Sequence, residues 1–195
     1  MLIASFHPYN NNINSTATTM STIHTVAKLI GLTSAAWLSD LGNISALSLI
    51  SVPAVATVKA ESKLSNGLAV RIWEQNYELG KSQNPLIALT SATSLGFLAW
   101  SLRGLRTVSV VGLRPTPLFA IAALSTFGLI PFTVAFMMGT NNKLLKYAEK
   151  AKKDDLSVTE TEDVDGLLKR WTFLNGIRGL FPLAGAVAAG IAIVA

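Results

Sequence analysis

The chain has 195 residues with no cysteine and two histidines, and its formal net charge is +5. Half of its residues are apolar, 14% are charged and the mean hydropathy is +0.45, which is more apolar than a soluble domain of this size needs. The absence of cysteine excludes disulfides and thiolate catalysis, and two histidines provide few ligands for a histidine-bound metal. It indicates a single membrane domain with no separate catalytic module.

The basic net charge does not indicate nucleic-acid binding. The Lys and Arg residues lie in short segments beside apolar stretches, and not along one exposed helix face. We therefore expect the lipid bilayer, and no nucleic acid, as the partner of these residues.

The chain divides into a polar N-terminal segment and four apolar segments. Residues 1–24 are rich in Asn, Ser and Thr without apolar periodicity, so we expect a disordered tail there. Residues 25–195 form the single predicted domain, and their clearest apolar segment is 115–142, 28 residues without a charge. A membrane helix needs about 20 apolar residues. The predicted fold is an all-α integral membrane four-helix bundle with spans at about 29–55, 85–102, 116–140 and 171–195.

The longer connections carry most of the charged residues. In residues 59–83, Val70, Trp73 and Tyr77 are three and four residues apart, which predicts a short amphipathic helix on the lipid headgroups. Residues 143–170 begin with the basic stretch KLLKYAEKAKK and continue with an acidic stretch. We expect the basic half to be helical and the acidic half to be flexible.

The distribution of Lys and Arg predicts an orientation in the membrane. Segments 59–83 and 143–170 hold 11 of these residues, whereas the segments on the opposite side of the membrane hold 4. Because basic loops stay in the cytoplasm, we expect a multi-pass protein with these two loops cytoplasmic and the N-terminus lumenal. The sequon at Asn14 is then on the side where glycosylation takes place.

The fourth span carries the main candidate site residues. Trp171, Asn175 and Arg178 are spaced at i, i+4 and i+7 and share one helix face. Inserting an arginine costs at least ~2.5 kcal/mol, so Arg178 either contacts a ligand or reaches polar groups between helices. Asn175 either joins neighbouring helices or contacts the same ligand. Trp171 fits an interfacial aromatic belt or a surface on which a ring stacks.

Two residues are candidates for proton transfer. Asp40 is the only acid inside a predicted span, and it lies at the lumenal headgroups or takes part in proton transfer. Asp40 and Arg178 lie at different predicted depths in the membrane. A water or ligand between the two side chains therefore fits the sequence as well as direct pairing does. His24 is a base near neutral pH or a solvated side chain at the lumenal end of the first span.

Further polar residues gather at the cytoplasmic end of the predicted bundle. Asn141 and Asn142 follow the third span, where they cap the helix or bind a substrate. Ser48 approaches the same end on the first span and packs between helices or contributes to that substrate site. The sequence holds no phosphate loop, nucleotide fingerprint or metalloprotease motif.

Two stretches of the sequence resemble a known family. TNNKLL and LLKRWTFLNGIRGLFPLAGAV resemble the anthrone oxygenase family, small four-span membrane proteins of fungal aromatic polyketide pathways with uncharacterised bacterial relatives. The resemblance runs from Gly31 onward. It is clearest at the pair Asn141 and Asn142 and at the helix face of Trp171, Asn175 and Arg178.

The resemblance implies an activity and roles for these residues. The activity is that of a monooxygenase-type oxidoreductase which converts an anthrone, of the emodin anthrone or noranthrone type, to the anthraquinone with molecular oxygen and no cofactor or metal. Arg178 then stabilises a phenolate or enolate oxygen, Asn175, Asn141 and Asn142 orient polar groups of the substrate, and Trp171 stacks on its rings. Asp40 and His24 are the candidate bases.

A non-catalytic interpretation stays open beside this one. In a tetraspan membrane scaffold or small transporter, the same polar face only binds helices together. A transporter of this kind usually has internal repeats, and the two halves of this chain show none, which favours the enzyme. The expected partners are a small aromatic polyketide and the bilayer, with homo-oligomerisation or association with pathway enzymes left open.

Overall fold

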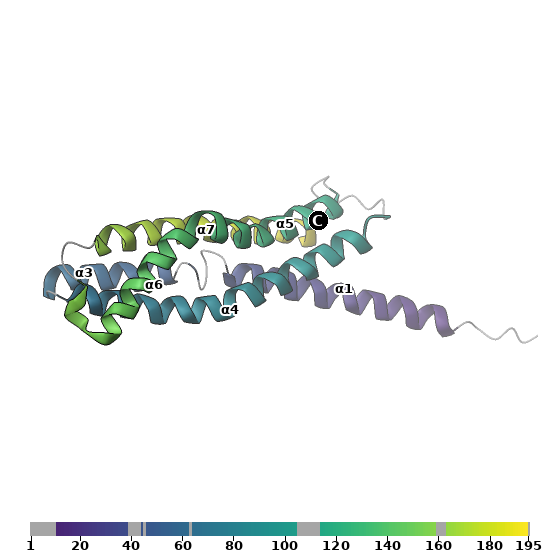
Figure 1. Cartoon of the computed structure of the whole chain (residues 1–195). Coiled ribbons are helices and arrows are strands. Elements are labelled where there is room, and N and C mark those ends of the chain that lie inside the picture. Colours follow the sequence, from purple (N-terminus) through teal and green to yellow (C-terminus); the bar gives the residue numbers. More distant parts are fainter. Residues whose placement is uncertain are drawn as a thin grey trace, which may run out of the picture.

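The structure is a computed structural model that describes residues 11–38, 44, 46–62, 64–104, 114–158 and 163–194, with side chains from residue 19 onward apart from Ser62. Within these ranges almost the whole chain is helical and no strand occurs. The long helices lie side by side in an elongated bundle (Figure 1). The predicted all-α class is therefore confirmed.

The first half of the chain runs along the bundle twice. Helix α1 spans Asn11–Leu38, a π-helical segment η1 spans Ala46–Ser51, and α3 spans Val52–Ser62. Helix α4 then returns over Asn66–Ser101. Its N-cap is Ser65, whose side-chain oxygen accepts a hydrogen bond from the Leu68 backbone N–H at 3.1 Å, the usual way of satisfying a free N–H at a helix start.

The second half runs along the bundle twice more. Helix α5 spans Pro115–Phe132 and is continued by a π-helical segment η2 over Thr133–Met137 and by α6 over Met138–Lys153. A 3-10 turn η3 at Asp155–Ser157 precedes α7, which spans Val164–Val194. Proline at the start of α5 fits a helix that begins there, because its missing N–H has no partner in the first turn.

Several predicted boundaries differ from the structure. The disordered tail is wrong for residues 11–24, which belong to α1, while residues 1–10 lie outside the described part. The described residues of the predicted first span, 29–55, belong mainly to α1, η1 and α3. The helices that contain the predicted second and third spans extend beyond them, because they continue through charged segments that the apolar criterion excluded.

Residues 66–83 were expected as a loop with a helix on the headgroups, and they form the first half of α4 instead. Val70 and Trp73 are 0% and 1% exposed, so the apolar face of this stretch packs into the protein. The spacing of Val70, Trp73 and Tyr77 correctly predicts a helix. It does not show whether the apolar face of that helix contacts lipid headgroups or the protein core, because both require the same spacing.

Two apolar clusters hold the bundle together at opposite ends. One joins α1, α4, α5 and α7 around Leu95, Phe119 and Ala189. The other joins α3, α4, α6 and α7 around Trp73, Leu144 and Trp171. A smaller cluster contains Ala88 of α4 and Leu129 of α5, and Leu129 also lines the site described below.

The two segments predicted to lie on one side of the membrane contact each other. Lys59 Nζ lies 2.7 Å from Asp165 Oδ1, and Ser65 Oγ lies 2.6 Å from Asp155 Oδ2. Lys152 Nζ lies 2.9 Å from Glu74 Oε1. These contacts place residues 59–83 and the described parts of 143–170 at the same end of the bundle.

Two of the described helices are long and apolar enough to cross a membrane: the continuous helix Pro115–Lys153 and α7. Helices α1 and α4 do not meet the same criteria of length, hydropathy and charge. The last 18 residues of α4, 84–101, carry no charge, but they contain Asn84 and several Ser and Thr residues, which keep their hydropathy below the criterion.

Candidate functional site

A cavity of about 260 Å³ lies between α4, the α5–η2 helix and α7, with Leu47 of η1 at its edge. Its volume is close to the lower end of the usual range for small-molecule sites, about 300–1,000 Å³. Apolar side chains form most of its surface. The side chains with polar groups are Asn76, Tyr77, Lys81, Asn84, Thr133, Trp171 and Arg178.

The cavity reaches the outer surface of the bundle beside η2. Two of its lining residues, Val134 and Met138, are 58% and 41% exposed. Both belong to or follow the π-helical segment, where the backbone departs from the regular α pattern. Such π segments inside helices are frequent at functional sites. The second one, η1, contributes Leu47 to the same cavity.

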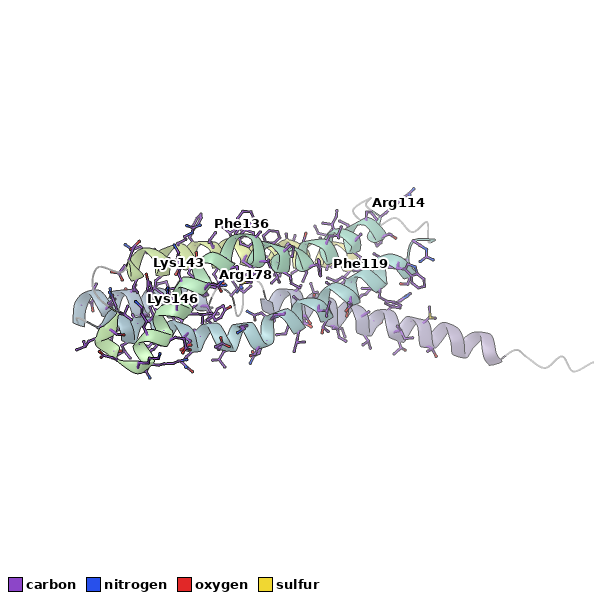
Figure 2. All side chains as sticks on the ribbon, viewed as in Figure 1. Arg114, Phe119, Phe136, Lys143, Lys146 and Arg178 are labelled. Carbon is purple, nitrogen blue, oxygen red and sulfur yellow. The ribbon has the colours of Figure 1, made fainter. Side chains whose placement is uncertain are left out.

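Arg178 brings a positive charge into this apolar space. It lies near the middle of α7, between the helices, with Lys143 and Lys146 toward one end of the bundle and Arg114 toward the other (Figure 2). Its Nε is buried and has no hydrogen-bond partner in the described part of the chain. No described Asp or Glu forms an ion pair with Arg178. A partly buried cation with no counter-ion among the described residues favours an anionic ligand.

Trp171 lines the same cavity seven residues before Arg178 and is 2% exposed. Its ring meets that of Trp73 edge-on, with centroids 5.8 Å apart and an interplanar angle of 87°. Trp73 in turn stacks on Tyr77, at 5.0 Å and 17°. Trp171 Nε1 is buried without a partner. These contacts fix an aromatic wall with an N–H donor, which suits a flat polar ring system.

Asn175 shares the helix face of Trp171 and Arg178, but it does not line the cavity. It is fully buried, and its Nδ2 donates hydrogen bonds to Ser48 Oγ at 2.6 Å and to the Ile44 carbonyl at 3.3 Å. Of the two interpretations, joining neighbouring helices is the one that the geometry favours. Ser48, predicted to bind substrate, is the acceptor in this contact.

Asn141 and Asn142 lie apart from the cavity lining. Both are inside α6, which continues to Lys153, so neither follows the end of the helix as predicted. Asn141 is buried, with its Oδ1 unpartnered, whereas Asn142 is exposed. A substrate contact for either one stays a prediction.

His24, one of the two predicted bases, does not line the cavity. The His24 ring lies 6.0 Å from that of Phe97, in contact with α4 far from the cavity. Phe97 is 12 residues beyond Pro85, the last α4 residue in the lining, which corresponds to about 18 Å along the helix. Asp40 lies outside the described residues. Asn14 falls in the first turns of α1, and its glycosylation stays a prediction.

The sequence contained a signal for the residues that were missed. Tyr77, Lys81 and Asn84 are spaced at i, i+4 and i+7, the same pattern that identified the face of α7, and all three line the cavity. Tyr77 and Lys81 fall in residues 59–83, which the sequence predicts as a loop, so their shared face with Asn84 is not recognised from the sequence. Among the described residues, no group of three or more His, Cys, Asp and Glu side chains is placed to hold a metal ion.

The fold and the site define a class of protein: an all-helical protein with an apolar cavity that contains an arginine beside aromatic side chains. Comparison with known proteins gives the family. Residues 73–188 match the family model for anthrone oxygenase, and this range includes every cavity residue except Leu47. The chain belongs to the anthrone oxygenase family.

Curated relatives cover most of the chain. Anthrone oxygenase encC of Aspergillus fumigatus is 35% identical over 177 residues, which are 86% of this chain and 92% of the relative. Noranthrone monooxygenase of Aspergillus flavus is 30% identical over 72% of this chain and 61% of its own length. Anthrone oxygenase gedH of Aspergillus terreus is 29% identical over 76% and 88%, respectively. No solved structure matches the chain.

Proposed function

We propose that this protein is a membrane-embedded oxygenase that converts an anthrone to the anthraquinone with molecular oxygen, as a step in aromatic polyketide biosynthesis. The observation that carries this proposal is Arg178, a cation without a described counter-ion in an apolar cavity. The names of the relatives supply the substrate class. An anthrone is a flat tricyclic ketone that becomes anionic when its methylene group loses a proton, so it matches both features of the cavity.

The reaction balances without a further reagent. One anthrone and one O₂ give one anthraquinone and one water, because the methylene carbon loses two hydrogens and gains one oxygen atom. Removal of the first proton leaves an electron-rich enolate, which reduces oxygen and adds it at the former methylene carbon. Loss of the second proton and cleavage of the O–O bond complete the carbonyl. Since the enolate itself supplies the electrons, the proposal requires no cofactor.

The cavity residues have separate roles in this scheme. Arg178 donates to the enolate oxygen and balances its charge, as a preorganised donor does for a developing oxyanion. Trp171 lies against the ring system and offers its free N–H to a substrate oxygen. Asn84 and Thr133 provide hydrogen-bonding groups for phenolic hydroxyls. Asn175 acts outside the cavity as a positioning residue, because it ties α7 to η1 through Ser48.

The same structure supports a four-span arrangement in the bilayer. Helices α1 and α4 pack along α5 and α7 over much of the bundle, and all four expose large apolar side chains. Leu29, Leu86, Leu124 and Leu180 are between 51% and 72% exposed. A soluble monomer rarely exposes so much apolar surface. In this arrangement the cavity opens beside η2 toward the lipid, from which an apolar anthrone enters.

Arg103 and Trp100 mark one edge of the apolar zone. The Arg103 guanidinium lies 4.3 Å from the centroid of the Trp100 ring, and Trp100 is 63% exposed. Trp and Arg side by side are typical of the membrane–water interface. By the distribution of basic residues, this edge is lumenal and the opposite end, with Lys59 and Lys152, is cytoplasmic.

The test is the reaction itself. Membranes from cells that express the chain are mixed with emodin anthrone, and oxygen uptake and quinone absorbance are recorded against membranes with an empty vector. The proposal expects faster quinone formation with one O₂ consumed per quinone. A rate equal to the empty vector for both emodin anthrone and noranthrone would favour a scaffold or transporter.

A further inference from the structure

The oxidation requires a group that accepts the methylene proton, and the cavity offers few. Among the described residues that line it, the titratable ones are Tyr77, Lys81 and Arg178. Arginine stays protonated in proteins and cannot accept a proton. Lys81 Nζ lies 3.2 and 3.4 Å from the two carboxylate oxygens of Glu78. Both of these side chains are about half exposed, so Lys81 lies in an ion pair with Glu78 at the rim of the cavity.

The other described candidates for the base lie outside the cavity. His24 contacts α4 about 18 Å farther along that helix. Glu74 is the buried carboxylate nearest in sequence, one turn before Tyr77, but it does not line the cavity. Its Oε1 accepts a hydrogen bond from Lys152 on α6, so it points to another part of the bundle. Tyr77 is therefore the remaining candidate proton acceptor among the described residues that line the cavity.

Tyr77 is also held in a defined position. Its ring stacks on that of Trp73 with an interplanar angle of 17°, and Trp73 is itself buried against Trp171. Lys81 Nζ lies 5.7 Å from the Tyr77 ring centroid on the side of the rim. Arg178 reaches the same cavity from α7. The aromatic contact fixes the ring, and the two cations can balance a negative charge in the cavity.

We propose that Tyr77 is the catalytic base, a role that rests on the proposed anthrone oxidation. Its phenolate oxygen takes the first methylene proton, and the C–H electron pair moves into the ring system to form the enolate. One negative charge is present throughout, first on Tyr77 and then on the substrate oxygen, with Arg178 available to both. After oxygen has been added, Tyr77 returns the first proton to the peroxide oxygen and becomes a phenolate again. It then removes the second proton from the former methylene carbon as the O–O bond breaks. Tyr77 passes this proton to the departing hydroxide, which leaves as water.

The experiment separates proton abstraction from oxidation. Without oxygen, membranes in D₂O can exchange the methylene hydrogens of emodin anthrone for deuterium but cannot form the quinone. Exchange is measured by mass spectrometry for wild type, Tyr77→Phe and an empty vector that corrects for spontaneous exchange. Tyr147→Phe is the matched control, because Tyr147 lies on α6 outside the cavity.

Wild type and Tyr147→Phe should accelerate exchange above the empty vector, and Tyr77→Phe should lose about 10²-fold or more of that acceleration, the size of a general-base contribution. Binding of the anthraquinone to the purified full-length chain, followed by tryptophan fluorescence, should be retained in Tyr77→Phe. Retained binding with lost exchange assigns the proton transfer to Tyr77. Lost binding would show a structural role instead and would overturn the proposal.

The outcomes distinguish a failure of the role of Tyr77 from a failure of the proposed anthrone oxidation. Exchange by Tyr77→Phe at the wild-type rate would overturn the role of Tyr77 and leave the anthrone oxidation intact. If wild type accelerates neither exchange without oxygen nor quinone formation in air, the proposed function itself fails and Tyr77 loses its role with it.

Discussion

Asn175 on α7 donates a hydrogen bond to Ser48 on η1, with Nδ2 2.6 Å from Oγ across 127 residues of sequence. Ser48 Oγ in turn donates to the Ile44 carbonyl at 2.9 Å. This chain of contacts fixes the rotation of α7 in the bundle. Arg178 follows Asn175 by three residues, so the contact also determines which way Arg178 faces.

The first prediction concerns this contact. Replacing Asn175 or Ser48 by alanine should each lower the thermal stability of the protein in detergent. The double variant should lose less than the sum of the two, with a coupling free energy of about 0.6 kcal/mol and at most ~1.7 kcal/mol, as for other hydrogen bonds between membrane helices. Strictly additive losses would mean that the two residues act independently.

The second prediction concerns the close approach of α5 and α7. A Cβ added at Gly185 would collide with the Thr126 hydroxyl and lie 2.9 Å from the Ala122 carbonyl. Gly185→Ala should therefore destabilise the protein by roughly 1–3 kcal/mol, the usual cost of overpacking. Gly190 on the same helix has nothing within 4 Å of such a Cβ. Gly190→Ala is the control and should be neutral or slightly stabilising in the same thermal unfolding measurement.

The third prediction concerns the ion pair between α4 and α6. Glu74 is buried and accepts from Lys152, whereas Glu149, the second partner of Lys152, is exposed. Lys152→Ala should lower the melting temperature more than Glu149→Ala, because it leaves a buried carboxylate unpaired. Glu74→Gln combined with Lys152→Ala should recover part of the loss. Equal melting temperatures for the two alanine variants would show that the pair contributes nothing.

The fourth prediction tests the orientation in the membrane. The chain has no cysteine, so a single one can be introduced without background. Arg114 and Lys146 lie toward opposite ends of the bundle (Figure 2). In sealed vesicles, an impermeant maleimide should label Lys146→Cys from the cytoplasmic side and Arg114→Cys only from the lumenal side. Labelling of both variants from one side would contradict the four-span topology.

The helices could be located from the sequence because long uncharged segments and residue spacing report directly on local structure. Their ends could not. Helix α4 begins 19 residues before Pro85, where the second span was placed, since its charged first half folds against α6 and α7. A hydropathy criterion treats Glu74 as a loop residue, because it does not detect the partner Lys152 that makes its burial possible.

Part of the candidate site could also be predicted from the spacing of residues along one helix. Arg178 and Trp171 stood out because an arginine and a tryptophan on one face of an apolar helix are unusual. Asn175 shares that face, yet its contact with Ser48 depends on where another helix lies, which spacing alone does not give. Tyr77, Lys81 and Asn84 also share an i, i+4, i+7 spacing, but the sequence predicts a loop over two of them. The structure shows that α4 extends through this segment and that all three residues line the cavity.

The central claim is that Arg178 stabilises the anion of a bound anthrone. The most direct measurement is the rate of quinone formation from emodin anthrone by membranes with wild type, Arg178→Gln and Arg178→Lys, at equal expression and corrected for an empty vector. Arg178→Gln should lose about 10²–10³-fold in rate, as expected for removal of an oxyanion donor, and Arg178→Lys should keep more of it. Full activity of Arg178→Gln would contradict the account.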